Sequence, residues 1–184
     1  MPSNIEIKAR VADAIRVRRL VEGTGASGPQ LLVQEDIFFA CRQGRMKLRI
    51  LSSDHGELIY YERPDMPGAK RSGYSIARTF TPIELKEVLA RALSILTVVK
   101  KRRLLYLLGQ TRIHLDEVEN LGSFIELEAV MGPDQPAEEG RQIVQDIMRR
   151  LEIEESNLIS CAYADLLSQR QNENDPSERG AGAG

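Results

Sequence analysis

Charged and apolar side chains alternate in two widely separated segments of this chain. The first segment is Asn4-Ile5-Glu6-Ile7-Lys8 and the second is Phe124-Ile125-Glu126-Leu127-Glu128. Because successive side chains of a β-strand point to opposite faces of its sheet, each segment predicts a strand with charge on one face and branched apolar residues on the other. Several such strands suggest a sheet that curls around a charged interior and packs its apolar face outward.

Further segments follow the same pattern and extend the predicted charged face. Half-solvated antiparallel sheets, with the polar side toward water, are the ordinary interpretation of any single strand of this kind. Like charges on neighbouring strands repel one another, so a face rich in Arg and Lys calls for a compensating polyanion. The predicted face gathers Lys8, Arg45, Lys47, Arg49, Lys100, Arg102 and Arg112 with the acidic residues Glu6, Asp116, Glu126 and Glu128.

Length and charge narrow the class of protein. A chain of 184 residues predicts one domain, with room for a tail. A net charge of -2 provides no general basic field for nucleic acid, so we expect no nucleic-acid partner. The chain shows neither an apolar run long enough for a bilayer nor an apolar leader, so we expect a cytoplasmic protein without a membrane partner. A homodimer is left open.

The two cysteines, Cys41 and Cys161, do not have metal-ligand spacing. We expect reduced thiols in an intracellular protein, although a single bridge between them is left open.

Turn residues and hydrophobic periodicity divide the chain into strands, helices and loops. Strands are expected over residues 5–10, 31–40, 45–51, 57–63, 74–79, 98–107, 111–118 and 123–130. Helices are expected from residue 13, from residue 82, over 138–151 and over 156–167, the last one capped by Ser156. Residues 26–29 and 64–73 are expected to be loops, and the polar end from Gln169 onward is expected to be disordered.

The charged residues suit one kind of chemistry. Arg forks and Lys ammonium groups bind groups with many anionic oxygens, such as a polyphosphate. Carboxylates on adjacent strands suit a hard divalent cation such as Mg²⁺ or Mn²⁺. Phosphoryl chemistry needs its charge neutralised and its attacking and leaving oxygens placed in line, which cations supply.

Five motifs occur in a collinear order that resembles one known family. They are Glu6-Ile7-Lys8, Lys47-Leu48-Arg49, Lys100-Lys101-Arg102, Arg112-Ile113-His114-Leu115-Asp116, and Leu121-Gly122 leading to Glu126-Leu127-Glu128. The chain resembles CYTH-domain proteins, the triphosphate tunnel metalloenzymes, which include class IV adenylyl cyclases, thiamine triphosphatases and inorganic tripolyphosphatases. The resemblance implies an α+β fold, in which an antiparallel eight-stranded β-barrel tunnel has helices packed outside. It places this domain at residues 1–168 and a tail at 169–184.

The resemblance also implies roles for individual residues. It implies that divalent metal, Mg²⁺ or Mn²⁺, is held by Glu6, Asp116, Glu126 and Glu128, with Asp116 either a ligand or a group that orients water. It implies that a small-molecule triphosphate is bound by Lys8, Lys47, Arg49, Arg63, Lys70, Lys100, Arg102 and Arg112, and that Glu6, Lys8 and Asp116 are catalytic. Which of residues 100–103 point inward is left open, because alternation cannot be carried across an unknown turn.

One position departs from the family pattern. The hallmark strand is E-x-E-x-K, and its first Glu is Asn4 in this chain. An Asn carbonyl can donate an oxygen to a metal but brings no charge, so we expect one weakened metal position.

Other polar residues receive simpler interpretations. Glu35 and Asp36 are interpreted as surface charges, and His114 as a structural hydrogen-bonding residue. Tyr60, Tyr61 and Tyr74 are interpreted as wall packing, although the family resemblance leaves a base-stacking site near the tunnel mouth open.

Three functions are compatible with these residues. The first is metal-dependent hydrolysis of a triphosphate that is organic, nucleoside or inorganic. The second is cyclisation of ATP to cyclic AMP and pyrophosphate, which replaces water by the ribose 3′-hydroxyl as nucleophile; residues 58–63 and 70–74 resemble the cyclase branch of the family. The third is a non-catalytic polyphosphate-binding module, which Asn4 favours.

Overall fold

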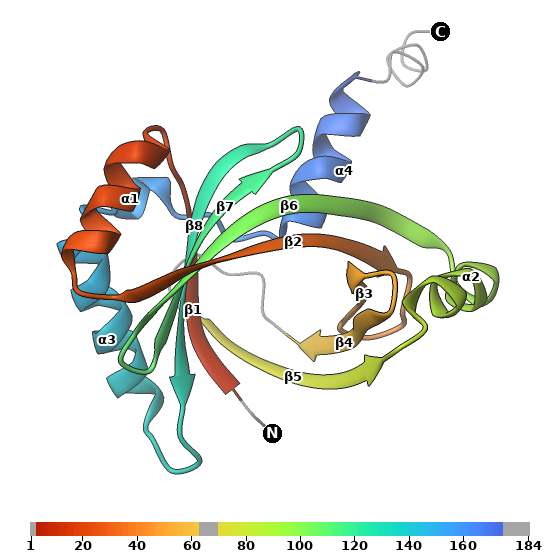
Figure 1. Ribbon diagram of the computed structural model, residues 1–184, viewed down its shortest axis with the longest axis horizontal. Coiled ribbons are helices and arrows are strands. Elements are labelled where there is room, and N and C mark those ends of the chain that lie inside the picture. The colour runs from red at the N-terminus through yellow and green to blue at the C-terminus, as the bar shows by residue number, and fades with distance from the viewer. Residues whose placement is uncertain (1–2, 63–69, 175–184) are drawn as a thin grey trace, which may run out of the picture.

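Eight antiparallel strands close into a barrel in the computed structural model, which describes residues 3–62 and 70–174 (Figure 1). Around the barrel the order is β1-β5-β4-β3-β2-β6-β7-β8, and β1 pairs with both β5 and β8. The strands are β1 Ser3–Arg10, β2 Ser27–Phe39, β3 Arg45–Ser52, β4 His55–Glu62, β5 Lys70–Thr79, β6 Ile95–Leu108, β7 Thr111–Val118 and β8 Gly122–Met131. The predicted α+β barrel is therefore confirmed.

Four α-helices pack outside this barrel: α1 Ala14–Gly23, α2 Pro82–Ala92, α3 Ala137–Arg150 and α4 Tyr163–Asn174. Figure 1 shows α1 and α3 together on one side, beside β1 and β8, and α2 at the opposite end. Helix α4 packs against β6 and follows a short 3₁₀ helix, η1, at Glu155–Asn157. None of the helices in the described ranges is both long and apolar enough to cross a bilayer.

The main apolar core lies between the outer face of the barrel and helices α1 and α3. Ile5 and Leu127, from β1 and β8, are buried there against Val144 and Ile147 of α3 and Val21 of α1. Each fully buried aliphatic side chain of this kind contributes roughly 1.5–3 kcal/mol. The alternation in the sequence therefore has the predicted meaning: the apolar face packs outward under helices and the charged face turns inward.

Helix α2 covers the far end of the barrel in the same way. Ile37 and Leu48 are buried beneath Leu85 and Leu89 of this helix. The inward-facing neighbours of these strand residues are thereby held in fixed directions toward the interior.

Two expected loops are strand instead. Strand β2 begins at Ser27, because a register shift between Ser27 and Gln30 lets the strand continue past Gly28. Gly28 has a φ of +127°, and a Cβ there would lie 2.7 Å from the carbonyl oxygen of Leu105, so glycine is required at this crossing. Strand β5 begins at Lys70, within the loop expected over 64–73.

The last helix also differs from expectation. Ser156 lies in η1 and does not cap α4, which begins at Tyr163 and continues to Asn174, beyond the expected end at Leu167. The side chain of Asp165 accepts a hydrogen bond from the backbone N–H of Ala162 at the start of this helix. Residues 63–69, with the predicted phosphate-binding Arg63, and residues 175–184 lie outside the described parts of the chain.

Candidate functional site

The barrel encloses a cavity of about 280 Å³ whose polar lining comes from β1, β2, β3, β6, β7 and β8. Its charged and polar side chains are Asn4, Glu6, Lys8, Gln34, Asp36, Lys47, Arg49, Lys101, Arg103, Arg112, His114, Glu126 and Glu128. Tyr61, Tyr74 and Ile76 contribute to a less polar part of the same wall.

Strand register places carboxylates beside cations on one side of the cavity. Lys8 pairs across the strands with Glu126, and its Nζ lies 3.0 Å from Glu126 Oε1. Arg103 donates to Glu126 Oε2 at 2.5 Å and to both oxygens of Asp116 at 2.6 Å. Burial is the largest influence on the pKa of Glu126 and raises it, but the charges of Lys8 and Arg103 outweigh burial and hold this pKa well below its usual value.

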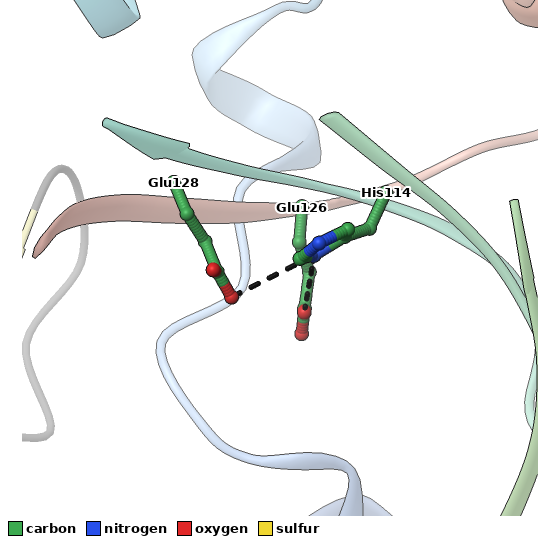
Figure 2. A group of neighbouring side chains, drawn as sticks. All are labelled: His114, Glu126 and Glu128. Atoms are coloured by element: carbon green, nitrogen blue, oxygen red, sulfur yellow. Dashed lines mark ion pairs between the residues drawn. The ribbon is translucent and has the colours of Figure 1, made fainter. Parts of the chain in front are cut away.

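Glu126 also belongs to a compact group with His114 and Glu128 on β7 and β8 (Figure 2). One potential ligand atom from each lies within 4.8 Å of the others. His114 Nδ1 is 3.7 Å from Glu126 and 3.6 Å from Glu128, too far for hydrogen bonds, and it has no hydrogen-bond partner among the described residues. The interpretation of His114 as a structural hydrogen-bonding residue stays a prediction, since only its Nδ1 lacks a partner among the described residues.

These residues fit a divalent cation. Two carboxylates and an imidazole suit Mn²⁺ and similar ions, while Mg²⁺ prefers oxygen ligands alone. Asn4, which also lines the cavity, is 5 % exposed and leaves its Oδ1 without a hydrogen-bond partner in the described part of the chain. Glu6 pairs across the strands with Glu128, so the predicted ligands Glu6, Glu126 and Glu128 come together in one region.

Opposite charges also meet on another wall of the cavity, around Asp36. This carboxylate lies 2.9 Å from Lys47, 2.8 Å from Arg49 and 3.1 Å from Lys101. Asp36 is only 1 % exposed, so its interpretation as a surface charge is wrong. The alternation in β2 could have revealed this position, since Ile37 and Phe39 face the outer core and Asp36 must face the opposite way.

This cluster changes the protonation of its members. Burial and the charge of Arg49 lower the pKa of Lys47 to about 7, against the opposing influence of Asp36. Burial alone would raise the pKa of Asp36, but Lys101, Lys47 and Arg49 together hold it well below its usual value.

The prediction for Lys100 and Arg102 is wrong. Both side chains are exposed on the outside of the barrel, where Arg102 is 66 % exposed and lies 4.0 Å from Glu117. The inward-facing residues of β6 are their neighbours Lys101 and Arg103, whose side chains are 3 % and 6 % exposed. The parity of β6 becomes clear only from its register with β2 and β7, which the sequence did not provide.

The remaining predicted residues divide into three groups. Arg112 lines the cavity, 3.5 Å from Glu128. Asp116 is buried but does not line the cavity, and it stands outside the His114–Glu126–Glu128 group. Lys70 is described only in its backbone, which pairs with Glu6.

Tyr163, at the start of α4, was not predicted as part of the site. Its hydroxyl donates to Asp116 at 2.9 Å, and its ring lies 3.7 Å from Lys8 Nζ. Tyr163 therefore supports both Asp116 and Lys8 from outside the strands, and no strand pattern could have indicated it. Cys41 and Cys161 are free thiols, as expected.

Comparison with known families gives the cavity a context, since the CYTH domain model matches residues 3–163. The chain belongs to the CYTH family. A protein of Methanocaldococcus jannaschii, whose name gives adenylate cyclase as its candidate activity, is 24% identical over 169 residues, which are 88% of this chain and 97% of that protein.

Solved structures share the fold of this CYTH protein. The PH1012 protein of Pyrococcus horikoshii has a TM-score of 0.79 and 28% identity, covering 89% of this chain and 98% of that one. A protein of Hippeastrum, described as a candidate adenylyl cyclase with a dominant triphosphatase activity, has a TM-score of 0.63 and 14% identity, covering 97% of this chain and 99% of its own. At that identity the likeness concerns the fold alone.

Proposed function

We propose that this CYTH protein hydrolyses a triphosphate with the help of a divalent cation. The observation that carries the proposal is that the His114–Glu126–Glu128 group and inward-facing Lys and Arg residues line the same cavity. A ligand that suits both the His114–Glu126–Glu128 group and the Lys and Arg residues must combine a bound cation with several anionic oxygens. A metal–triphosphate complex has this composition.

The cations lie on two walls of the cavity. Lys47, Arg49 and Lys101 surround Asp36, whereas Lys8 and Arg103 surround Glu126. A triphosphate between the walls would give both groups of cations additional anionic oxygens, and the paired carboxylates would keep the side chains in place. Arg guanidinium groups can then bind phosphate oxygens in pairs.

The reaction requires little covalent chemistry from the protein. A water oxygen bonds to the terminal phosphorus while the bridging P–O bond breaks, and the products are phosphate and the diphosphate. We propose that Glu126, Glu128 and His114 hold the cation, while Lys8 and Arg103 orient the phosphates and Glu6 orients the water. When bound, the cation would supply neutralisation of the phosphate charge.

Asp116 has a supporting role in this proposal. Both its oxygens accept from Arg103, and Tyr163 donates to one of them. These contacts favour Asp116 as the residue that orients Arg103, in place of the metal-ligand role that the resemblance implied.

Cyclisation of ATP is the second candidate. Tyr61, Tyr74 and Ile76 on the cavity wall offer an apolar surface on which a purine could pack. The M. jannaschii relative carries a name of the cyclase type. In this reaction the ribose 3′-hydroxyl would attack the α-phosphorus and pyrophosphate would leave.

Product analysis separates these functions. The purified protein is incubated with ATP, thiamine triphosphate and tripolyphosphate, each with Mg²⁺ or Mn²⁺ and each with a chelator. Metal-dependent phosphate release supports hydrolysis, whereas cyclic AMP with pyrophosphate supports the cyclase. Tight binding without any product would leave only a polyphosphate-binding module and overturn the proposed enzyme.

A further inference from the structure

We propose that Asp36 is a positioning residue for triphosphate binding, because its carboxylate gathers Lys47, Arg49 and Lys101 at one place in the cavity. The inference rests on the proposed function, since it takes these three cations as phosphate-binding groups.

The contacts of Asp36 come from both neighbouring strands. Arg49 of β3 donates to Oδ1 at 2.8 Å and to Oδ2 at 3.1 Å. Oδ2 also accepts from Lys47 of β3 at 2.9 Å and from Lys101 of β6 at 3.1 Å. The carboxylate of β2 therefore connects three adjacent strands through one buried point.

Charge explains why the free protein needs this carboxylate. Three cations brought together in a buried place repel one another, and an uncompensated buried charge is costly. One carboxylate neutralises part of this charge and leaves a local excess that attracts a polyanion. Once phosphate oxygens occupy the cavity, they supply much of the attraction that Asp36 provides alone in the free protein.

The same contacts set the protonation of Lys47. The groups that face its ammonium are Asp36, Arg49 and Lys101, with the ring of Tyr61 5.9 Å away. Burial, Arg49 and Lys101 lower the pKa of Lys47, and Asp36 raises it by charge and by a hydrogen bond, with a resulting pKa of about 7. Without the charge of Asp36 this pKa would fall further, and Lys47 would be largely neutral at neutral pH.

This linkage makes anion binding depend on pH in a specific way. Below its free pKa, Lys47 is already charged and phosphate binding takes up no proton there. Above that pKa, Lys47 must take up a proton on binding, so affinity falls by about tenfold per pH unit until the pKa of the bound state is reached. Asp36→Asn should move the start of this fall to lower pH.

The experiment measures the dissociation constant of inorganic tripolyphosphate by calorimetry at about pH 6 and about pH 8, in the presence of a chelator to prevent turnover. At each pH the dissociation constant of the variant is divided by that of the wild type, so that the titration of the ligand itself cancels. We expect Asp36→Asn to weaken binding at both values, with a loss at least about threefold larger at the higher pH. Glu117→Gln removes an equal charge from the outside of the barrel and should change affinity less than about twofold.

Lys47→Gln keeps the test valid if Asp36→Asn does not fold, because retention of the wild-type pH dependence by Lys47→Gln would overturn the inference. Lys47→Gln should lose the pH dependence, and Lys47→Gln combined with Asp36→Asn should bind about tenfold more weakly than Lys47→Gln alone, because Arg49 and Lys101 still lose their common partner. Equal affinity of these two proteins would overturn the inference. So would tighter binding by Asp36→Asn at both pH values, which would make Asp36 a mere competitor of the ligand.

The binding measurements distinguish a failure of the proposed function from a failure of the inference alone. A wild-type protein that binds no tripolyphosphate, with or without Mg²⁺, overturns the proposed function and the inference with it. A wild-type protein that binds, beside an Asp36→Asn variant with the same affinity and pH profile, overturns the inference alone.

Discussion

Replacing Arg103 by Met tests whether the charged interior of the barrel is a connected structure. Its guanidinium donates to both oxygens of Asp116 at 2.6 Å and to Glu126 at 2.5 Å, and its side chain is 6 % exposed. Arg103→Met leaves two buried carboxylates without their shared cation. Breaking buried ion pairs in this way costs about 3–5 kcal/mol.

The neighbouring residue provides a matched control. Arg102 is 66 % exposed, and its distance to Glu117 is 4.0 Å. Such surface pairs contribute about 0–1 kcal/mol, so Arg102→Met should change the free energy of unfolding by no more than that. Urea unfolding followed by circular dichroism measures both variants, with slopes compared to ensure that the same surface is exposed on unfolding.

The pH dependence of the difference identifies its cause. Asp116 and Glu126 have lowered pKa values in the folded protein: burial, the largest influence, opposes this shift, and Arg103 promotes it. A carboxylate with a lowered folded pKa stabilises the protein above its unfolded pKa and loses that contribution as pH falls through the folded pKa. The gap between wild type and Arg103→Met should therefore be full at neutral pH and begin to narrow below about pH 4.5. A loss below about 1 kcal/mol at neutral pH, or one that does not change with acid, would refute this account of the interior.

Three further predictions concern the cavity. Lys101→Gln should lower kcat/KM for the preferred triphosphate by about 100-fold, because it removes a buried charge-assisted contact. Lys100→Gln, on the outside of the barrel, should change kcat/KM by no more than about twofold. Equal losses in the two variants would contradict the observed parity of β6. Asn4→Glu should tighten Mn²⁺ binding measured by calorimetry roughly tenfold, since it adds a charged ligand, and an unaltered metal titration would mean that position 4 is not a ligand. Tyr163→Phe should lower the free energy of unfolding by about 1–3 kcal/mol, because Asp116 loses a buried donor, and an unchanged urea midpoint would show that this hydrogen bond contributes nothing.

Much of the fold follows from alternation in the sequence. Strand β7 covers Thr111–Val118, the predicted range, because its charged and apolar residues alternate without interruption. Strand β2 begins earlier than predicted because Gly28 and Pro29, residues typical of loops, are accommodated by a register shift. That shift depends on the partner strand, which a single segment of sequence does not reveal.

The candidate site was predictable where the residue type and the alternation of a strand both indicate the inward face. It was less predictable where only the pairing with a neighbouring strand or helix determines which residues face inward. Glu126 and Lys8 stand on strands whose apolar faces identify the inner side, and both line the cavity. In the run from Lys100 to Arg103 every residue is basic, so residue type could not indicate which two face inward. Tyr163 reaches the site from a helix far along the chain, and its contacts arise from tertiary packing alone.

The internal pairing of charges explains how such an interior can exist before a ligand binds. A barrel lined by Lys and Arg alone would repel itself, and isolated buried charges would be unstable. Asp36 and Glu126 each accept from cations on neighbouring strands, so the same contacts that join the strands also prepare the cavity for an anion. Ligand binding then becomes a redistribution of existing ion pairs, and the carboxylates set both the place and the protonation of the groups that meet the phosphates.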